Sequence, residues 1–353
     1  MASGQASVNV VAVGARTPVG LRASFAAAAV RAGISRIAEH PFLVDSAGEP
    51  MMVAMDSTLE PDERVDRLKA LLISAVDEAL ENVTKRDTLP VFIALPERND
   101  FFTQADERNI IDALAGHLRG RFRADIHGFA KGNAAGLLAL QQAFESLRTP
   151  ASHALVAGVD SKVERSFLMQ LDASGRLASL SNQWGYPPGE GGGAALLTSA
   201  DPRTNDRSTA LMRVASVATG VEKNVIYSDT VNVGAGLTQV FRQAIESSLK
   251  SKDATVTAIY CDVNGERYRT QEYLYASTRV DTYLAAPTKF TTGIDCWGDV
   301  GAAAGPLLVS LAFASADRGY AEGSHALVWA SSESGLRGAA VFELSPRPVV
   351  VAA

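Results

Sequence analysis

The chain has 353 residues, with 33 Lys and Arg, 39 Asp and Glu, five His and two Cys, which gives a formal net charge of −6. An apolar content of 47% and a charged content of 20% are typical of a folded globular protein and argue against disorder. Two cysteines cannot form a disulfide framework or a four-thiolate zinc site, and the acidic balance argues against nucleic acid as a partner.

No segment predicts a membrane span or a signal peptide. The longest uncharged run, 300–316, is rich in Gly and Ala and falls short of the ~20 strongly apolar residues that a span needs. The first ten residues lack the basic and apolar regions of a signal peptide. We therefore expect a cytoplasmic protein with no membrane partner, in which Cys261 and Cys296 are reduced.

Strands and helices alternate along the chain. An apolar run at 8–13 predicts a strand, and the small residues of 22–31 predict a helix. Apolar residues at helical spacing between 65 and 83, behind a Pro61 suited to a first turn, predict another helix. Residues 90–95 predict a second strand. This alternation predicts an α/β fold in which helices cover both faces of a parallel or mixed sheet.

A five-residue sequence occurs twice. Ser-His-Ala-Leu-Val at 152–156 returns at 324–328, and each copy follows a Gly- and Ala-rich helix and precedes another apolar strand. The helices are expected at 132–147 and 301–316, and the strands at 193–198 and 338–344. We therefore predict two similar halves, 1–200 and 209–353, which a polar linker at 201–208 joins into one closely packed unit.

Six short motifs follow one another along the chain. They are VAVGARTPVG (11–20), NAAGLLALQQA (133–143), LVAGVDS (155–161), GEGGGAALL (189–197), YCDVNGERYRTQE (260–272) and GDVGAAAG (298–305). In their order and separation they resemble the thiolase-like fold and, within it, the β-ketoacyl-[acyl carrier protein] synthases. The resemblance covers most of the chain and is weakest between 40 and 125. It implies a duplicated, five-layered α-β-α-β-α architecture.

The resemblance also implies where catalytic residues should lie. In that family a cysteine at a helix N-terminus accepts the acyl group as a thiolate, and two histidines stabilise the enolate that decarboxylation forms. The cysteine position is Asn133 here, and the first histidine position is Asn264. The second is Asp299 if the glycine motif after it sets the register, or Ile294 if Lys289 sets it. All three catalytic side chains are replaced in either register.

Structural roles are the leading interpretation of these positions. We predict that Asn133 and Asp299 cap the helices that follow them, and that Asn264 forms a turn with the next glycine. His127 is expected to be a buried, hydrogen-bonded core histidine, with a catalytic role as the alternative. Lys289 and Glu190 are further candidate pocket residues.

No cofactor or metal is predicted. Cys261 and Cys296 are expected to be inert, buried hydrophobes. No His, Cys, Asp and Glu set has metal-ligand spacing. The glycines of 189–193 lack the layout of a phosphate-binding loop and indicate backbone crowding at the start of a strand.

Three functions remain open. The leading hypothesis is a non-condensing homologue of the β-ketoacyl synthases, serving as the partner subunit of an active synthase or as a binder of acyl chains or acyl carrier protein. By resemblance, it would form a homodimer or a heterodimer about the strand near the nucleophile helix. The alternative is an active acyltransferase or condensing enzyme in which Asn264 polarises a carbonyl and Asp299 or His127 acts as base. The third is an unrelated α/β binding module.

Overall fold

The computed structural model describes residues 7–60, 63–83, 88–147, 152–199, 210–249, 251 and 254–348. Up to residue 199 the elements are β1 (Val8–Arg16), α1 (Ala23–Arg31), β2 (Ile37–Val44), β3 (Pro50–Ala54), α2 (Arg64–Ala79), β4 (Thr88–Leu95), α3 (Gln104–Leu118), β5 (Arg123–Ala130), η1 (Gly132–Ala134), α4 (Ala135–Ser146), β6 (His153–Ser161), α5 (Arg165–Ala173) and β7 (Glu190–Ser199). From residue 210 they are β8 (Met212–Val221), α6 (Ala235–Ser248), β9 (Ala258–Cys261), α7 (Arg267–Thr278), η3 (Asp281–Tyr283), α8 (Ile294–Trp297), η4 (Gly301–Ala303), α9 (Ala304–Asp317), β10 (His325–Ser331) and β11 (Leu336–Leu344).

The predicted elements at 8–13, 22–31, 65–83 and 90–95 correspond to β1, α1, α2 and β4. The repeated sequence begins β6 and β10, each of which comes after one of the two Gly- and Ala-rich helices, α4 and α9. Pro61 and the predicted linker at 201–208 lie outside the described residues.

The strand pairings occur twice in the same order. Within the described residues, all strands except β2 and β3 form a nine-stranded mixed sheet, β5-β4-β6-β7-β1-β8-β11-β10-β9. In the first half β4 runs parallel to β5 and β6, and β7 is antiparallel to β6 and β1. In the second half β10 runs parallel to β9, and β11 is antiparallel to β10 and β8. A short antiparallel pairing of β1 with β8 joins the halves.

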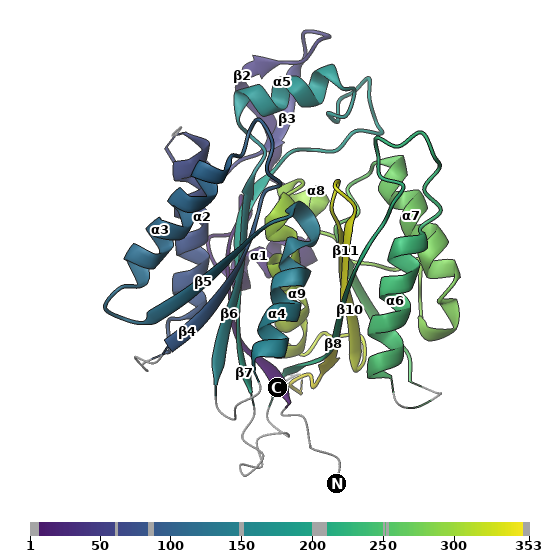
Figure 1. The fold of residues 1–353 in the computed structure, drawn as a ribbon. Coiled ribbons are helices and arrows are strands. Elements are labelled where there is room, and N and C mark those ends of the chain that lie inside the picture. Colours follow the sequence, from purple (N-terminus) through teal and green to yellow (C-terminus); the bar gives the residue numbers. More distant parts are fainter. Residues whose placement is uncertain are drawn as a thin grey trace, which may run out of the picture.

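The helices make three layers around these two half-sheets (Figure 1). α4 and α9 lie in the centre, because α4 contacts β4 and β6 of one half and β8 and β11 of the other, and α9 contacts β7 and β10. α2 and α3 cover the outer side of the first half, and α6 covers the outer side of the second half, with α7 packed against it. The structure therefore confirms the predicted five-layered α-β-α-β-α fold.

Glycines allow the two central helices to approach closely. A Cβ atom on Gly136 of α4 would lie 2.6 Å from Cδ of Pro306 and 3.0 Å from Cα of Gly305 in α9. Most of α9 is buried, from Ala304 to Ala312 without interruption. The uncharged run at 300–316 is thus a core helix, as predicted. No helix in the described part of the chain is long and apolar enough to cross a membrane.

The β2–β3 hairpin and α5 form a small additional layer at one end of the molecule (top of Figure 1). Their core contains Met51, Val53, Leu168 and Leu171, and it holds Tyr186 with only 1% of its surface exposed. This layer matters for the site because Tyr186, which belongs to its core, lies beside Lys162.

Candidate functional site

Asn133, Asn264 and Asp299 lie together in the interior, although they are far apart in the sequence. Asn133 is in η1, Asn264 follows β9, and Asp299 precedes η4. Nδ2 of Asn264 donates to Oδ2 of Asp299 at 2.8 Å, and Nδ2 of Asn133 donates to Oδ1 of Asp299 at 3.4 Å. The three residues are 5%, 1% and 1% exposed, in sequence order. Asp299, rather than Ile294 in α8, therefore gives the register in which the three positions converge.

Lys162 completes this group. It follows β6, and its Nζ donates to Oδ1 of Asp299 at 2.9 Å and lies 5.1 Å from the centre of the Tyr186 ring. The lysine is 7% exposed. Sequence reasoning missed it: the lysine directly follows the strand motif at 155–161, but nothing nearby in the sequence identifies the aspartate that neutralises it. Asn133, Asn264, Asp299 and Lys162 are called the central polar cluster below.

Asp299 and Lys162, the two ionisable residues of the central polar cluster, both stay charged. Burial alone would raise the pKa of Asp299, but Lys162 and Arg269 outweigh burial and hold that pKa well below its ordinary value. Burial also acts to lower the pKa of Lys162, yet Asp299, followed by Tyr186 and Asp160, raises it well above its ordinary value. Near neutral pH, Asp299 is therefore a weak base and Lys162 a protonated, non-nucleophilic amine.

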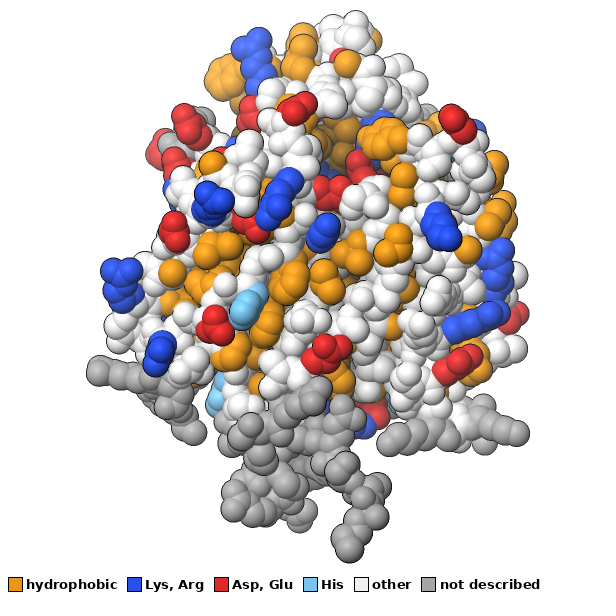
Figure 2. Space-filling view, in the orientation of Figure 1, with side chains coloured by type: hydrophobic (Ala, Val, Ile, Leu, Met, Phe, Trp, Pro, Cys, Tyr) orange, Lys and Arg blue, Asp and Glu red, His pale blue; other side chains and the backbone are white. Residues whose placement is uncertain are grey.

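A chain of polar contacts leads from the cluster to a surface cavity. Glu266 accepts from Nδ2 of Asn264 at 3.1 Å and from Nε of Arg176 at 2.7 Å. Arg176 in turn donates to Oε1 of Glu333 at 2.7 Å. Arg176, Glu333 and Tyr186 line a cavity of about 350 Å³. Figure 2 shows a hollow below the end formed by β2, β3 and α5, with charged side chains at its rim.

The predicted capping role of Asn133 is wrong. No side chain caps η1 or α4 in the N-cap position, which Lys131 and Ala134 respectively occupy. Instead, Oγ of Ser332 accepts from the amide of Ala134 at 2.8 Å and donates to the carbonyl of Lys131 at 2.5 Å. This serine from the loop after β10 therefore bonds to the helix start, whereas Nδ2 of Asn133 donates to Asp299.

The roles predicted for Asp299 and Asn264 hold only in part. Oδ1 of Asp299 accepts from the amide of Gly301 at 2.9 Å, as a cap would, but Val300 is the N-cap residue of η4 and three side chains also donate to this carboxylate. Asn264 forms the predicted turn, since Oδ1 accepts from the amide of Glu266 and Gly265 has φ +96°. Its amide group additionally joins the cluster.

His127 is not the buried core residue that the sequence predicted. It lies on β5, the edge strand of the described sheet, and its side chain is 49% exposed. The ring stacks on Phe92 with centroids 5.3 Å apart, and Nε2 lies 3.3 Å from Oδ2 of Asp125. Alternate side chains of an edge strand face outward, and His127 is one of these. It is therefore a surface residue, and its ring contacts Phe92 and Asp125 rather than a member of the cluster.

Lys289 and Glu190 also lie outside the site. Lys289 is 69% exposed, pairs with Glu322 at 2.8 Å and lines a different cavity, of about 370 Å³. Glu190 is fully buried at the start of β7, where Arg67 binds both of its carboxylate oxygens and Ser161 donates to it at 2.9 Å. It holds β7 to α2 rather than facing a cavity. The crowding predicted for the adjacent glycines is confirmed, because a Cβ atom on Gly189 would lie 2.0 Å from the carbonyl oxygen of Trp297.

The chemistry available at the central polar cluster is limited. Cys261 and Cys296 are both buried, unpaired thiols, and burial raises the pKa of each. Among the described residues, no group of three or more His, Cys, Asp or Glu side chains could hold a metal ion. The cluster itself offers two amides, a carboxylate and an ammonium group, which can form hydrogen bonds but supply no nucleophile.

Comparison with known proteins gives a consistent architecture. No protein-family model and no curated protein matches the sequence. Among solved structures, the ishigamide ketosynthase/chain length factor is 22% identical, with a TM-score of 0.67 over 96% of this chain and 99% of the other. A second structure, of a type II PKS acyl-carrier protein in complex with its ketosynthase bound to the hexaketide, is 14% identical. Its TM-score is 0.75, again over 96% of this chain and 99% of the other. The chain has the thiolase-like fold of the ketosynthases. A β-ketoacyl synthase from Burkholderia phymatum STM815 is 11% identical, with a TM-score of 0.75.

Proposed function

We propose that this protein is a non-condensing homologue of the β-ketoacyl synthases that serves as the partner subunit of an active synthase. The observation that carries the proposal is the central polar cluster. Where the resemblance expects a thiolate and two imidazoles, the chain has two amides and a carboxylate, which is ion-paired to Lys162. None of these groups accepts an acyl chain as a thioester.

The charges and hydrogen bonds of the cluster argue against the alternative, an active enzyme in which Asn264 polarises a carbonyl and Asp299 or His127 acts as base. Decarboxylative condensation needs a nucleophile and donors aimed at the enolate oxygen. The amide of Asn264 is a donor, but Asp299 and Glu266 already accept its hydrogens at 2.8 and 3.1 Å. Asp299 has a depressed pKa and is a weak base, and His127 is a surface residue of β5.

A partner role is supported by the position of β5. This strand leads directly into η1 and Asn133, and its outer edge is unpaired in the described part of the chain. An exposed strand edge presents main-chain donors and acceptors to a second chain. The resemblance implies pairing about this strand, and one structure of the same fold is that of a ketosynthase/chain length factor. We therefore propose that β5 pairs with a second ketosynthase-fold chain.

Intact mass spectrometry tests the absence of condensing chemistry. The protein is incubated with acyl-CoA, acyl-[acyl carrier protein] and malonyl thioesters, and a cysteine-containing ketosynthase serves as the positive control. We expect no covalent acyl adduct and no release of carbon dioxide, because the cluster contains no nucleophile. An adduct on any residue, or decarboxylation above the rate without protein, would show that the non-condensing assignment is wrong.

A further inference from the structure

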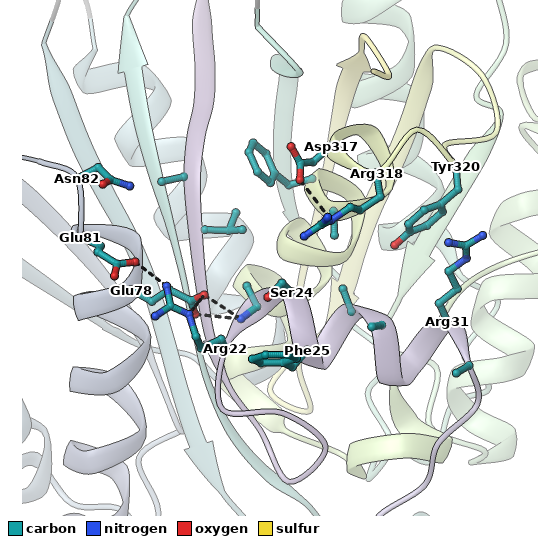
Figure 3. Close-up of a pocket in the computed structure, with 18 residues that line it drawn as sticks. Arg22, Ser24, Phe25, Arg31, Glu78, Glu81, Asn82, Asp317, Arg318 and Tyr320 are labelled. Carbon is teal, nitrogen blue, oxygen red and sulfur yellow. Dashed lines mark hydrogen bonds and ion pairs between the residues drawn. The ribbon is translucent and has the colours of Figure 1, made fainter. Parts of the chain in front are cut away.

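A second, larger cavity lies away from the central polar cluster. It occupies about 920 Å³ between α1, β1 and the carboxyl-terminal ends of α2 and α9 (Figure 3). A volume of this size is within the range of small-molecule sites, roughly 300–1,000 Å³. No residue of the cluster lines it. We call it the α1 groove.

The floor of the α1 groove is made of small apolar side chains. The apolar part of the lining consists of Ala12, Val13, Ala23, Ala27, Ala28, Ala32 and Ala314, together with Phe25 and Phe313. Because alanine side chains are short, they leave a trough that longer side chains would fill. Phe25 is 64% exposed, which is unusual for a phenylalanine beside such a trough. The floor therefore suits a slender apolar chain.

At one end of the groove, the charged side chains are already paired. Oε2 of Glu78 accepts from the amide of Ala15 in β1 and from the amide of Ala23 at the N-terminus of α1, each at 2.9 Å. Arg22 lies 3.2 Å from Glu78 and 2.5 Å from Glu81. Figure 3 shows these ion pairs at one side of the cavity. The carboxylates here have partners, so this end requires no charged ligand.

The opposite end has an excess of positive charge. The guanidinium of Arg31 stacks on Tyr320, 4.1 Å from the ring centre, and in the described part of the chain no carboxylate lies within 4.0 Å of it. Arg318 and Arg347 share Asp317 as their carboxylate, at 3.6 and 3.1 Å. Asp317 is therefore the one carboxylate that the described structure pairs with any of these three arginines, of which Arg31 and Arg318 line the groove.

The helix ends reduce this excess but do not remove it. α1 ends at Arg31 and α9 ends at Asp317, and each helix C-terminus carries roughly half a negative elementary charge. Two such ends offset about one of the two surplus positive charges. The remainder matches one monoanion. Arg31, Arg318 and Tyr320 line the same end of the groove (Figure 3), and Arg31 lies directly on the Tyr320 ring.

We propose that the α1 groove binds a linear aliphatic monocarboxylate, a ligand of the fatty-acid type. The chain lies along the alanine floor, and the carboxylate binds between Arg31, Arg318 and the hydroxyl of Tyr320. Guanidinium groups favour this geometry because they can donate two parallel hydrogen bonds to a carboxylate. The site does not depend on the proposed partner role, since it shares no residue with the cluster or with β5.

Isothermal titration calorimetry with decanoate tests the proposal, and decyltrimethylammonium serves as the probe with the same chain and opposite charge. Both probes are used below their micellar concentrations. The wild type is expected to bind decanoate saturably and at least tenfold more tightly than the cationic probe. The double variant Arg31→Gln/Arg318→Gln should weaken decanoate binding at least tenfold, whereas Arg119→Gln, an exposed arginine at the end of α3, should leave it unchanged.

A third variant separates the chain-binding floor from the charged end. Ala28 is exposed in the groove, so Ala28→Phe fills the trough without overpacking the core, and it should abolish binding of decanoate. Thermal melting establishes that each variant is folded. The proposal is overturned if the wild type shows no saturable binding, if the cationic probe binds as tightly as decanoate, or if a folded Ala28→Phe variant binds like the wild type.

Discussion

Among individual residues, the Lys162–Asp299 pair is the most consequential. Both side chains are almost fully buried, and each offsets the charge of the other at 2.9 Å. Removing one member of such a pair leaves an uncompensated charge in the interior, which is far more costly than losing an exposed ion pair. The stability of the site therefore rests on a contact between two segments that the sequence separates widely.

Lys162→Met is expected to lower the free energy of unfolding by about 3–5 kcal/mol, because it leaves the Asp299 carboxylate buried without its cation. The matched control is Lys289→Met, which removes an exposed pair with Glu322 and should cost less than about 1 kcal/mol. Urea unfolding at pH 7 measures both. The depressed pKa of Asp299 stabilises the fold above the ordinary value of 3.8, and this contribution fades as the pH falls below it. Equal losses in the two variants would contradict the assignment.

The three replaced positions could be found from the sequence, because short motifs fix them locally. Asn133, Asn264 and Asp299 each sit beside a recognisable glycine or strand motif, and the structure brings them within hydrogen-bonding distance. Their partners could not be found in the same way. The lysine that neutralises Asp299 and the serine that bonds to the helix start beside Asn133 come from distant segments, and no local pattern records such contacts.

At the level of elements, the α4–α9 contact positions the site. Asn133 and Asp299 stand at the N-terminal ends of these helices, and the spacing of the helices sets how far apart the two side chains lie. That spacing depends on Gly136 and Gly305, whose Cα atoms approach the opposite helix directly. The alternation of strands and helices predicted the layers, but it did not show that β5 is an edge strand, and so the exposure of His127 was missed.

Gly136→Ala should destabilise the protein by about 1–3 kcal/mol, because its new methyl group would lie 2.6 Å from Pro306 and force the helices apart. Gly116→Ala on α3 provides the control. A Cβ atom there has no neighbour within 4 Å, so the substitution should stabilise the helix by about 0.4–1 kcal/mol. Chemical denaturation compares the two variants with the wild type. A stabilising Gly136→Ala would show that the helices tolerate a wider separation.

At the level of the whole molecule, the proposed pairing through β5 can be tested with two copies of this chain. His127→Glu would place a second acidic group beside Asp125 on β5, and pairing of two copies about this strand would then bring four carboxylates together. We expect at least tenfold weaker dimerisation by sedimentation velocity. Gln104→Glu, an exposed position on α3 with the same change in charge, is the control. Unchanged association of the His127→Glu variant would exclude β5 as the pairing strand.

The pairing of β1 with β7 and β8 has a consequence for how the protein folds during synthesis. β1 leaves the ribosome well before its strand partners, which begin at Glu190 and Met212. Until those segments emerge, β1 is an unpaired apolar strand that must avoid association with other chains. Contacts between such distant segments also slow folding, because a long loop must close before they form. The seam that unites the two halves therefore cannot assemble until β8 has been synthesised, although β1 precedes it by about 200 residues.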